Sequence, residues 1–202
     1  MSPRNYSLGK RAQSVEETRR RIVDATFQLH NEKGVVATSM QDIADRADVS
    51  LHTVYSHFPT VDALVGGCAN KVIALLSPPG PDIFRCLDTI EARLGKLTGE
   101  LFAMYERGAL QIETARCEAS EVAALAGFVA DDAMNREALV GEALRPFRVP
   151  LRRMRPVTAL TDFYVWKAFN LQAVSTHRAA EVVTAALVAL ISPSETGKGK
   201  TK

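Results

Sequence analysis

The chain has 202 residues, of which 47% are hydrophobic and 24% are charged, and its formal net charge is +2. This length allows one large domain or two small ones with a real core, and the small net charge means that any nucleic-acid binding needs a local basic patch. Three scattered cysteines indicate neither a disulfide framework nor a structural zinc site, and we find no secretory signal and no apolar run of about 18 residues, so we expect a cytoplasmic protein without a membrane span.

Residues 1–13 mix proline, glycine, asparagine and basic residues, and this composition predicts a disordered basic arm. A first helix is expected to begin at Ser14, which has the spacing of a capping box with Glu17, and to end at Gly34. Four residues at helical spacing predict its buried stripe: Ile22, Ala25, Thr26 and Leu29. The basic run Arg19–Arg21 is either a solvated helix face or an edge that faces phosphates.

Two short helices joined by a tight turn are predicted next. Ser39 has Asp42 three residues later and can cap the first of them. Asp48 stands in the turn, because Asp tolerates the left-handed region better than most residues. Ser50 can cap the second helix, Leu51–His57, and two helices joined in this way must cross.

A third helix is expected from Thr60 to about Leu76, weakened in its middle by Gly66 and Gly67. The segment SPPGP at 77–81 then marks a boundary. Every later pattern is helical, with helices predicted from Asp82 and over 109–128, 131–146, 157–174 and 176–191. We therefore predict an all-α fold of about nine helices, with domains at 14–77 and 82–191 and a disordered tail at 192–202.

The second short helix has the polarity of a helix that reads DNA. Val54 and Phe58 point inward, whereas the polar and small residues from Leu51 to His57 point outward, as a helix in the major groove requires. Tyr55 can reach a phosphate with its hydroxyl group. The alternative interpretation is an ordinary corner between two helices.

This stretch resembles the TetR/AcrR family of bacterial transcription regulators, whose pattern runs T-T-x-x-x-I-A-x-x-A-G-V-S-x-G-T-L-Y-x-H-F. The residues that match are Thr38-Ser39, Ile43-Ala44, Ala47, Val49-Ser50, Thr53, Tyr55, His57-Phe58 and Leu64. The resemblance covers roughly residues 15–72. Asp48 and His52 stand where the family has glycine, and Val61 stands where it has lysine.

The resemblance implies an N-terminal helix-turn-helix unit of three helices and a C-terminal bundle that binds a ligand and forms a homodimer through the last two helices. It implies that base edges and phosphates of a double-stranded, near-palindromic operator are contacted by Thr38, Ser39, Ser50, Leu51, His52, Thr53, Tyr55 and His57. For the effector pocket we select three aromatic residues of the C-terminal half, Tyr105, Phe128 and Trp166, although most aromatic residues there are expected in the core.

The sequence thus predicts a ligand-responsive transcriptional regulator, a repressor that a small lipophilic effector releases from DNA. The alternative is a DNA-binding adaptor controlled by a protein partner. We predict no enzyme, because no acidic and nucleophilic constellation stands out, and no cofactor. His52, His57 and Cys68 could suggest a metal, but both histidines are explained as surface residues of the reading helix, so no metal site is predicted. The GKGKT segment at 197–201 lacks the first glycine, the strand and the helix of a phosphate loop.

Overall fold

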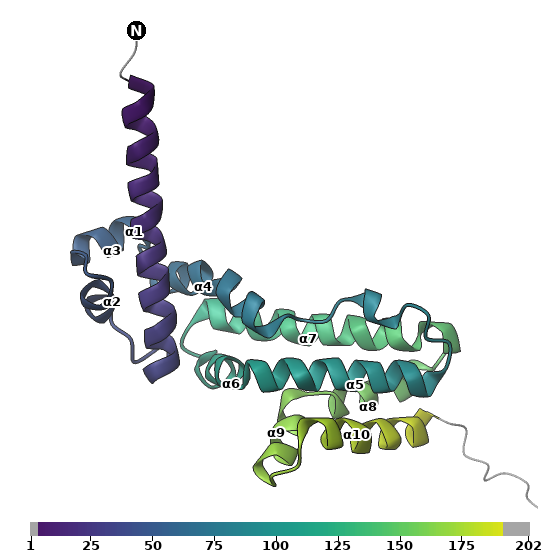
Figure 1. Cartoon of the computed structure of the whole chain (residues 1–202). Helices are drawn as coiled ribbons and strands as arrows, with labels where there is room; N and C mark the ends of the chain where they lie inside the picture. The colour runs from purple at the N-terminus through teal and green to yellow at the C-terminus, as the bar shows by residue number, and fades with distance from the viewer. Residues whose placement is uncertain (1–3, 192–202) are drawn as a thin grey trace, which may run out of the picture. The chain divides into compact units, whose positions relative to one another are not determined.

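The computed structural model describes residues 4–191; the expected tail at 192–202 and the first three residues of the expected arm lie outside the described residues. Between residues 4 and 191 the chain forms ten α-helices, two short 3-10 helices and no strand (Figure 1), which confirms the all-α class.

The N-terminal helices are α1 (Arg4–Lys33), α2 (Met40–Ala47), α3 (Leu51–His57) and α4 (Val61–Leu76). They are followed by η1 (Pro81–Phe84), α5 (Ile90–Arg107), α6 (Ala109–Glu118), α7 (Ala123–Leu144), η2 (Arg145–Phe147), α8 (Leu151–Leu160), α9 (Phe163–Leu171) and α10 (Thr176–Ile191). The chain divides into two compact units. The described part of the first unit comprises residues 4–75 and 109–130, and that of the second comprises residues 76–108 and 131–191.

Helix α1 begins at Arg4, so residues 4–13 are helical where their composition predicted a disordered arm. Ser14 therefore lies inside the helix and forms no capping box; its carbonyl oxygen accepts a hydrogen bond from Thr18 Oγ1 at 2.9 Å. Lysine, arginine, alanine, glutamine and glutamate dominate residues 10–20, and these good helix formers carry the helix through the expected cap.

The core of the first unit is formed by one face of α1 and the inward faces of α2, α3 and α4. The predicted stripe of α1 is confirmed, since each of its four residues is at most 5% exposed. The apolar core residues are Ile22, Val23, Ala25, Leu29, Ile43, Ala44, Ala47, Val54, Phe58, Leu64 and Cys68.

Helix α4 is continuous across Gly66 and Gly67, and Thr60 caps it as expected, with Ala63 N–H donating to Thr60 Oγ1 at 3.1 Å. The 24-residue segment Val61–Phe84 is apolar enough, with a mean hydropathy of 1.2, to cross a membrane by length and composition alone. Its α-helical part ends at Leu76 and is shorter than the roughly 20 residues that a membrane span needs. We therefore assign α4 to the core of the first unit, where Leu64 and Cys68 are buried.

The chain after residue 80 differs from the predicted helix boundaries in three places. The helix expected from Asp82 is the 3-10 turn η1, and α5 begins only at Ile90, after a cap by Thr89. The two helices predicted over 109–128 and 131–146 are instead α6, which ends at Glu118, and the unbroken α7.

The third difference is the helix predicted over 157–174, which is divided in two. Pro156 lies inside α8, and the helix is interrupted at Thr161 and Asp162. Asp162 caps α9 by accepting the N–H of Tyr164 at 2.9 Å, and its second carboxylate oxygen accepts Arg136 Nη1 at 2.6 Å. The break is thus fixed by a contact with a residue of α7.

Helix α5 packs along α10 and forms the centre of the second unit. Their contact includes a hydrogen bond of 2.6 Å between the hydroxyl groups of Thr98 and Thr184. The large buried side chains of this unit include Leu94, Leu97, Leu101, Phe102, Tyr105, Phe163 and Leu187.

Candidate nucleic-acid interface

The two short helices begin at side-chain caps, as the sequence predicted. Ser39 is the extended residue before α2, where its Oγ accepts Asp42 N–H at 3.1 Å while Asp42 accepts the Ser39 N–H at 2.8 Å. Ser50 has the same role before α3 and accepts Thr53 N–H at 3.1 Å. These caps satisfy backbone donors that would otherwise have no partner, so both helices start at a fixed residue.

The turn between the helices is left-handed at Asp48, with φ 51° and ψ 56°. Val49 N–H donates to the carbonyl oxygen of Ala44 at 3.0 Å, which closes a helix-ending motif around Asp48. Ala44 and Val54 are fully buried and Phe58 is 2% exposed, so the crossing of α2 and α3 is held by apolar contacts. The prediction of a tight turn and crossing helices is confirmed.

The side chains expected to contact base edges differ in their exposure and in whether they already form hydrogen bonds. Leu51 is 36% exposed, and His52 is exposed beside it in the first turn of α3. Thr53 is half-buried, and its hydroxyl lies 2.8 Å from the hydroxyl of Ser50, so both belong to the cap. The structure therefore leaves Leu51 and His52 as the free side chains at the start of this helix.

The residues expected to contact phosphates are also unequal. Tyr55 is 47% exposed and Ser39 is exposed, whereas His57 is half-buried with its ring 6.5 Å from that of Phe58. Thr38 is only 7% exposed, and its hydroxyl donates to the carbonyl oxygen of Gly34 at 2.6 Å.

Several charged side chains near α2 and α3 are engaged within the protein. Lys33 Nζ lies 2.7 Å from the carboxylate of Asp42; this hydrogen bond and those from Ser39 hold the pKa of Asp42 well below its usual range. Arg46 bonds Glu32 through both guanidinium Nη atoms, at 2.8 and 2.9 Å. On α1, Arg19 lies 5.0 Å from the centre of the Phe58 ring. Lys71 of α4 lies 2.7 Å from Asp24.

Two functional candidates escaped the sequence patterns because their partners are distant along the chain. Arg21 of α1 donates to the carbonyl oxygens of Ala47 and Asp48 in the turn. Glu118, the last residue of α6, accepts the backbone N–H groups of Val35 at 2.8 Å and Val36 at 3.0 Å, in the loop before α2. The basic run on α1 was the only sequence signal for Arg21, and it suggested a phosphate contact.

The three aromatic residues selected for an effector pocket do not form one cluster. Tyr105 and Trp166 lie together in the second unit with ring centres 6.3 Å apart, and both are nearly inaccessible. Burial raises the pKa of Tyr105, with a further rise from the charge of Asp132, and its hydroxyl donates to the Thr161 carbonyl at 2.9 Å. Phe128 packs in the first unit against the cluster of Val35, Ala115, Val122 and Leu125.

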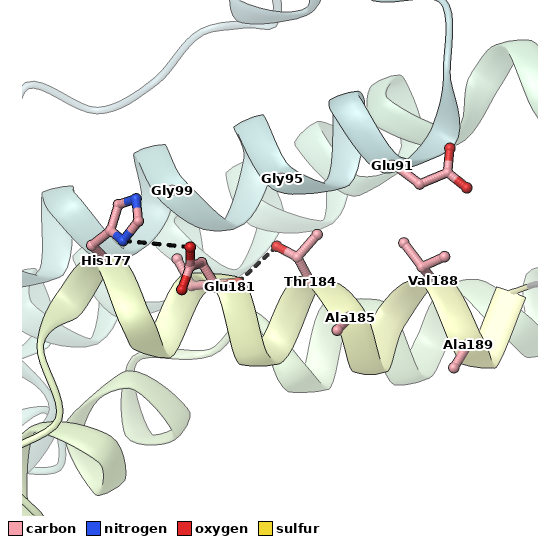
Figure 2. A pocket seen from close by; sticks show the side chains of 10 residues that line it. Glu91, Gly95, Gly99, His177, Glu181, Thr184, Ala185, Val188 and Ala189 are labelled. Atoms are coloured by element: carbon pink, nitrogen blue, oxygen red, sulfur yellow. Dashed lines mark hydrogen bonds and ion pairs between the residues drawn. The ribbon is translucent and has the colours of Figure 1, made fainter.

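The second unit also has an open groove of about 620 Å³ between α5 and α10 (Figure 2). Gly95 and Gly99 leave space on α5, and His177 and Glu181, 3.8 Å apart, lie at one end of the lining of α10. None of the three selected aromatic residues lines this groove. Across residues 4–191 no group of three histidine, cysteine, aspartate or glutamate side chains is placed to hold a metal ion.

Comparison with known proteins supports the geometry of the first unit. The family model described as bacterial regulatory proteins, tetR family, matches residues 22–68. The HTH-type transcriptional repressor KstR of Mycobacterium tuberculosis is 45% identical over 53 residues, which are 26% of this chain and 23% of that protein. KstR of Mycolicibacterium smegmatis is 30% identical over 106 residues, 52% of this chain and 51% of the relative. The chain thus matches between about a quarter and a half of the length of these relatives.

Solved structures extend the likeness to the whole fold. The multidrug binding protein EbrR complexed with imidazole has a TM-score of 0.62 at 24% identity, over 89% of this chain and 93% of that chain. A TetR family member of Streptomyces coelicolor has a TM-score of 0.63 at 23% identity, over 88% and 99%. The SmeT–triclosan complex has a TM-score of 0.62 at 15% identity, over 92% and 100%. Residues 22–68 thus match the tetR family of bacterial regulatory proteins over the capped helix-turn-helix, and the described chain shares the fold of these solved structures.

Proposed function

We propose that the protein is a cytoplasmic DNA-binding transcriptional regulator, a repressor that a small lipophilic effector releases from its operator. The observation that carries this proposal is the first turn of α3, where Leu51 and His52 are exposed on a helix fixed by the Ser50 cap. A short helix held in this way presents its N-terminal residues to the major groove.

Within this proposal the side chains have three roles: base contact, phosphate contact and support of the helix-turn-helix. Leu51 offers apolar contact to a thymine methyl group, and His52 offers a ring nitrogen to a base edge. Tyr55, Ser39 and His57 contact phosphates, which set the position of the protein but not the sequence that it selects. Thr53 and Ser50 maintain the cap of α3. The hydroxyl group of Thr38 donates its hydrogen bond to the carbonyl oxygen of Gly34 and supports the loop before α2.

The protein is proposed to act as a homodimer through α9 and α10. Support comes from large apolar side chains that are exposed on these helices: Tyr164 at 51%, Leu171 at 71%, Val182 at 40% and Leu190 at 47%. A two-fold axis places two copies of α3 on the same face of DNA, so the operator is expected to be a near-palindrome with half-sites one helical turn apart.

Repression and effector binding are supported by what related proteins do. KstR is named a transcriptional repressor, EbrR is named a multidrug binding protein, and SmeT was solved with triclosan. We place the effector beside Tyr105 and Trp166 in the second unit, and Phe128, which packs in the first unit, is left out of this pocket. The effector must bind the DNA-incompetent state better than the competent one, because equal affinity for both states shifts nothing.

The DNA part of the proposal is tested by selecting duplexes from a random library with the full chain. His52→Ala combined with Tyr55→Phe is expected to weaken binding to the selected duplex by about 10- to 100-fold, because a base contact and a phosphate contact are lost. Arg85→Ala, an exposed residue outside the first unit and outside α9 and α10, is the control and should bind as the wild type does. Unchanged affinity of the double variant would remove α3 from the interface.

The effector part needs a separate experiment, because a protein partner could release the DNA instead. A panel of lipophilic compounds is tested for a rise in the melting temperature, and then for release of the selected duplex. A compound that does both is expected, and Trp166→Ala should weaken its effect. If no compound does either, while the duplex is still bound, the adaptor controlled by a protein partner replaces the ligand sensor.

A further inference from the structure

We propose that Arg21 is a positioning residue for the DNA-reading helix: it holds the left-handed turn at Asp48 through the backbone, instead of contacting phosphate. This inference rests on the proposed function of α3. Arg21 Nη2 donates to the carbonyl oxygen of Ala47, the last residue of α2, and to that of Asp48 at 2.8 Å. It also lies 3.4 Å from the Asp48 carboxylate.

The two carbonyl groups need this partner. The last carbonyl groups of a helix accept no hydrogen bond from within the helix. They also carry the negative end of its dipole. A positively charged guanidinium group at this position donates to two of these carbonyl groups at once. Its charge is also attracted to the negative end of the dipole. The Asp48 side chain is fully exposed, so its ion pair with Arg21 adds little, and the backbone contacts carry the interaction.

The turn is the point where this support matters for DNA binding. Asp48 has φ 51°, a conformation that glycine adopts freely and that residues with a side chain adopt at a cost. Ser50, which caps α3, follows two residues later. Any change in the backbone at residues 47–49 therefore moves the cap, and with it the direction in which Leu51 and His52 point.

Arg21 differs in this respect from its neighbours on α1. Arg19 lies over the ring of Phe58, whereas Arg20 is exposed and forms no hydrogen bond or ion pair with the described residues. Arg20 thus provides a matched control: its replacement removes the same charge from the same helix without touching the turn.

A positioning role and a phosphate contact predict different salt dependences. A residue that neutralises one phosphate contributes about one unit to the slope of log K against log salt concentration, because it releases counterions. A residue that holds the turn lowers the affinity at every salt concentration and leaves this slope unchanged. The loss of such a residue is also repaired when glycine, which adopts the left-handed conformation without a steric cost, replaces the residue in the turn.

The experiment measures the affinity of the full-length protein for a duplex that the wild type selects from a random library, at several salt concentrations. The variants are Arg21→Met, Asp48→Gly, the two combined, and Arg20→Met. We expect Arg21→Met to weaken binding about 3- to 10-fold without a change of slope, the size expected for a partly exposed charge-assisted hydrogen bond. Asp48→Gly in the Arg21→Met background should recover at least half of that loss on a logarithmic scale.

Three results would overturn the inference: an unchanged affinity of Arg21→Met, a slope reduced by about one unit, or a combined variant that binds no better than Arg21→Met. If Arg21→Met does not fold by circular dichroism, the combined variant decides, since it must fold and bind if the turn is what Arg21 holds. A wild type that selects no duplex refutes the DNA-binding proposal itself, which distinguishes that failure from one confined to Arg21.

Discussion

Gly67 of α4 lies directly against the ring of Phe58, the residue that follows α3. A Cβ atom built on Gly67 would lie 2.7 Å from Cε1 and 3.2 Å from Cζ of that ring. Phe58 is 2% exposed and belongs to the core of the first unit, so its ring has little room to move aside. The glycine therefore sets how closely α4 packs on the end of the reading helix.

Gly67→Ala is expected to lower the free energy of unfolding by about 1–3 kcal/mol, because the added methyl group overpacks the core. Gly66→Ala is the matched control, since a Cβ at Gly66 meets no atom within 4 Å. That variant should instead gain up to about 1 kcal/mol from the better helix propensity of alanine. Urea unfolding of both variants measures the difference, and equal effects would contradict the close packing.

Glu118 is expected to stabilise the loop before α2. Its carboxylate accepts two backbone N–H groups, of Val35 and Val36, and the loss of a partner leaves a polar group without its hydrogen bond. Glu118→Ala should cost about 2 kcal/mol of unfolding free energy, and Glu118→Gln about half of that, because it keeps an uncharged acceptor. The exposed Glu121→Ala, three residues later, should change the free energy by less than about 0.5 kcal/mol.

His30 predicts a loss of stability in mild acid. Burial lowers the pKa of His30 from 6.5 to about 4, although the charge of Glu118 acts in the opposite direction. Below pH 6.5 His30 is protonated in the unfolded chain but stays neutral in the folded chain. The contribution of His30 to the free energy of unfolding is therefore fully present above pH 6.5 and is lost as the pH falls toward 4.

The loss attributable to His30 is about 2 kcal/mol at pH 5 relative to pH 7. His30→Gln should remove that part of the pH dependence, whereas His177→Gln, on the exposed surface of α10, should retain it. Chemical unfolding at both pH values measures the two differences. A wild type and a His30→Gln variant with the same pH dependence would show that His30 takes up its proton in the folded state.

The helices of the first unit could be read from the sequence because their signals are local. The Ser39–Asp42 capping box, the left-handed Asp48 and the Ser50 cap each involve residues at most five positions apart. The side chains expected at the DNA could be named by the same pattern. The sequence could not predict which of these side chains are free to contact DNA. That depends on which hydroxyl groups already form hydrogen bonds within the protein, as those of Thr38 and Thr53 do.

The helices after residue 80 were harder to predict because their ends depend on distant partners. Pro156 looks like a helix end in the sequence but lies within α8, while the true break is stabilised by Arg136 bonding Asp162. Likewise Glu118 ends α6 with its side chain bound to a loop about eighty residues earlier. Local spacing carries no information on such contacts.

Arg93 is only 6% exposed and joins three parts of the second unit. Its guanidinium group donates to four backbone carbonyl oxygens, those of Phe84 and Leu87 at 3.1 Å, Glu142 at 2.7 Å and Ala143 at 2.8 Å.

A lysine in place of Arg93 keeps the charge but has a single nitrogen, which cannot reach acceptors on both sides of the planar group. Arg93→Lys should therefore cost about 3 kcal/mol, because buried carbonyl groups are left without a donor. Arg85→Lys is the control: Arg85 is exposed, and its ion pair with Asp82 should survive the change with an effect below about 0.5 kcal/mol. Thermal unfolding of the two variants decides the matter, because similar melting temperatures would mean that the four carbonyl groups find other donors when Arg93 is gone.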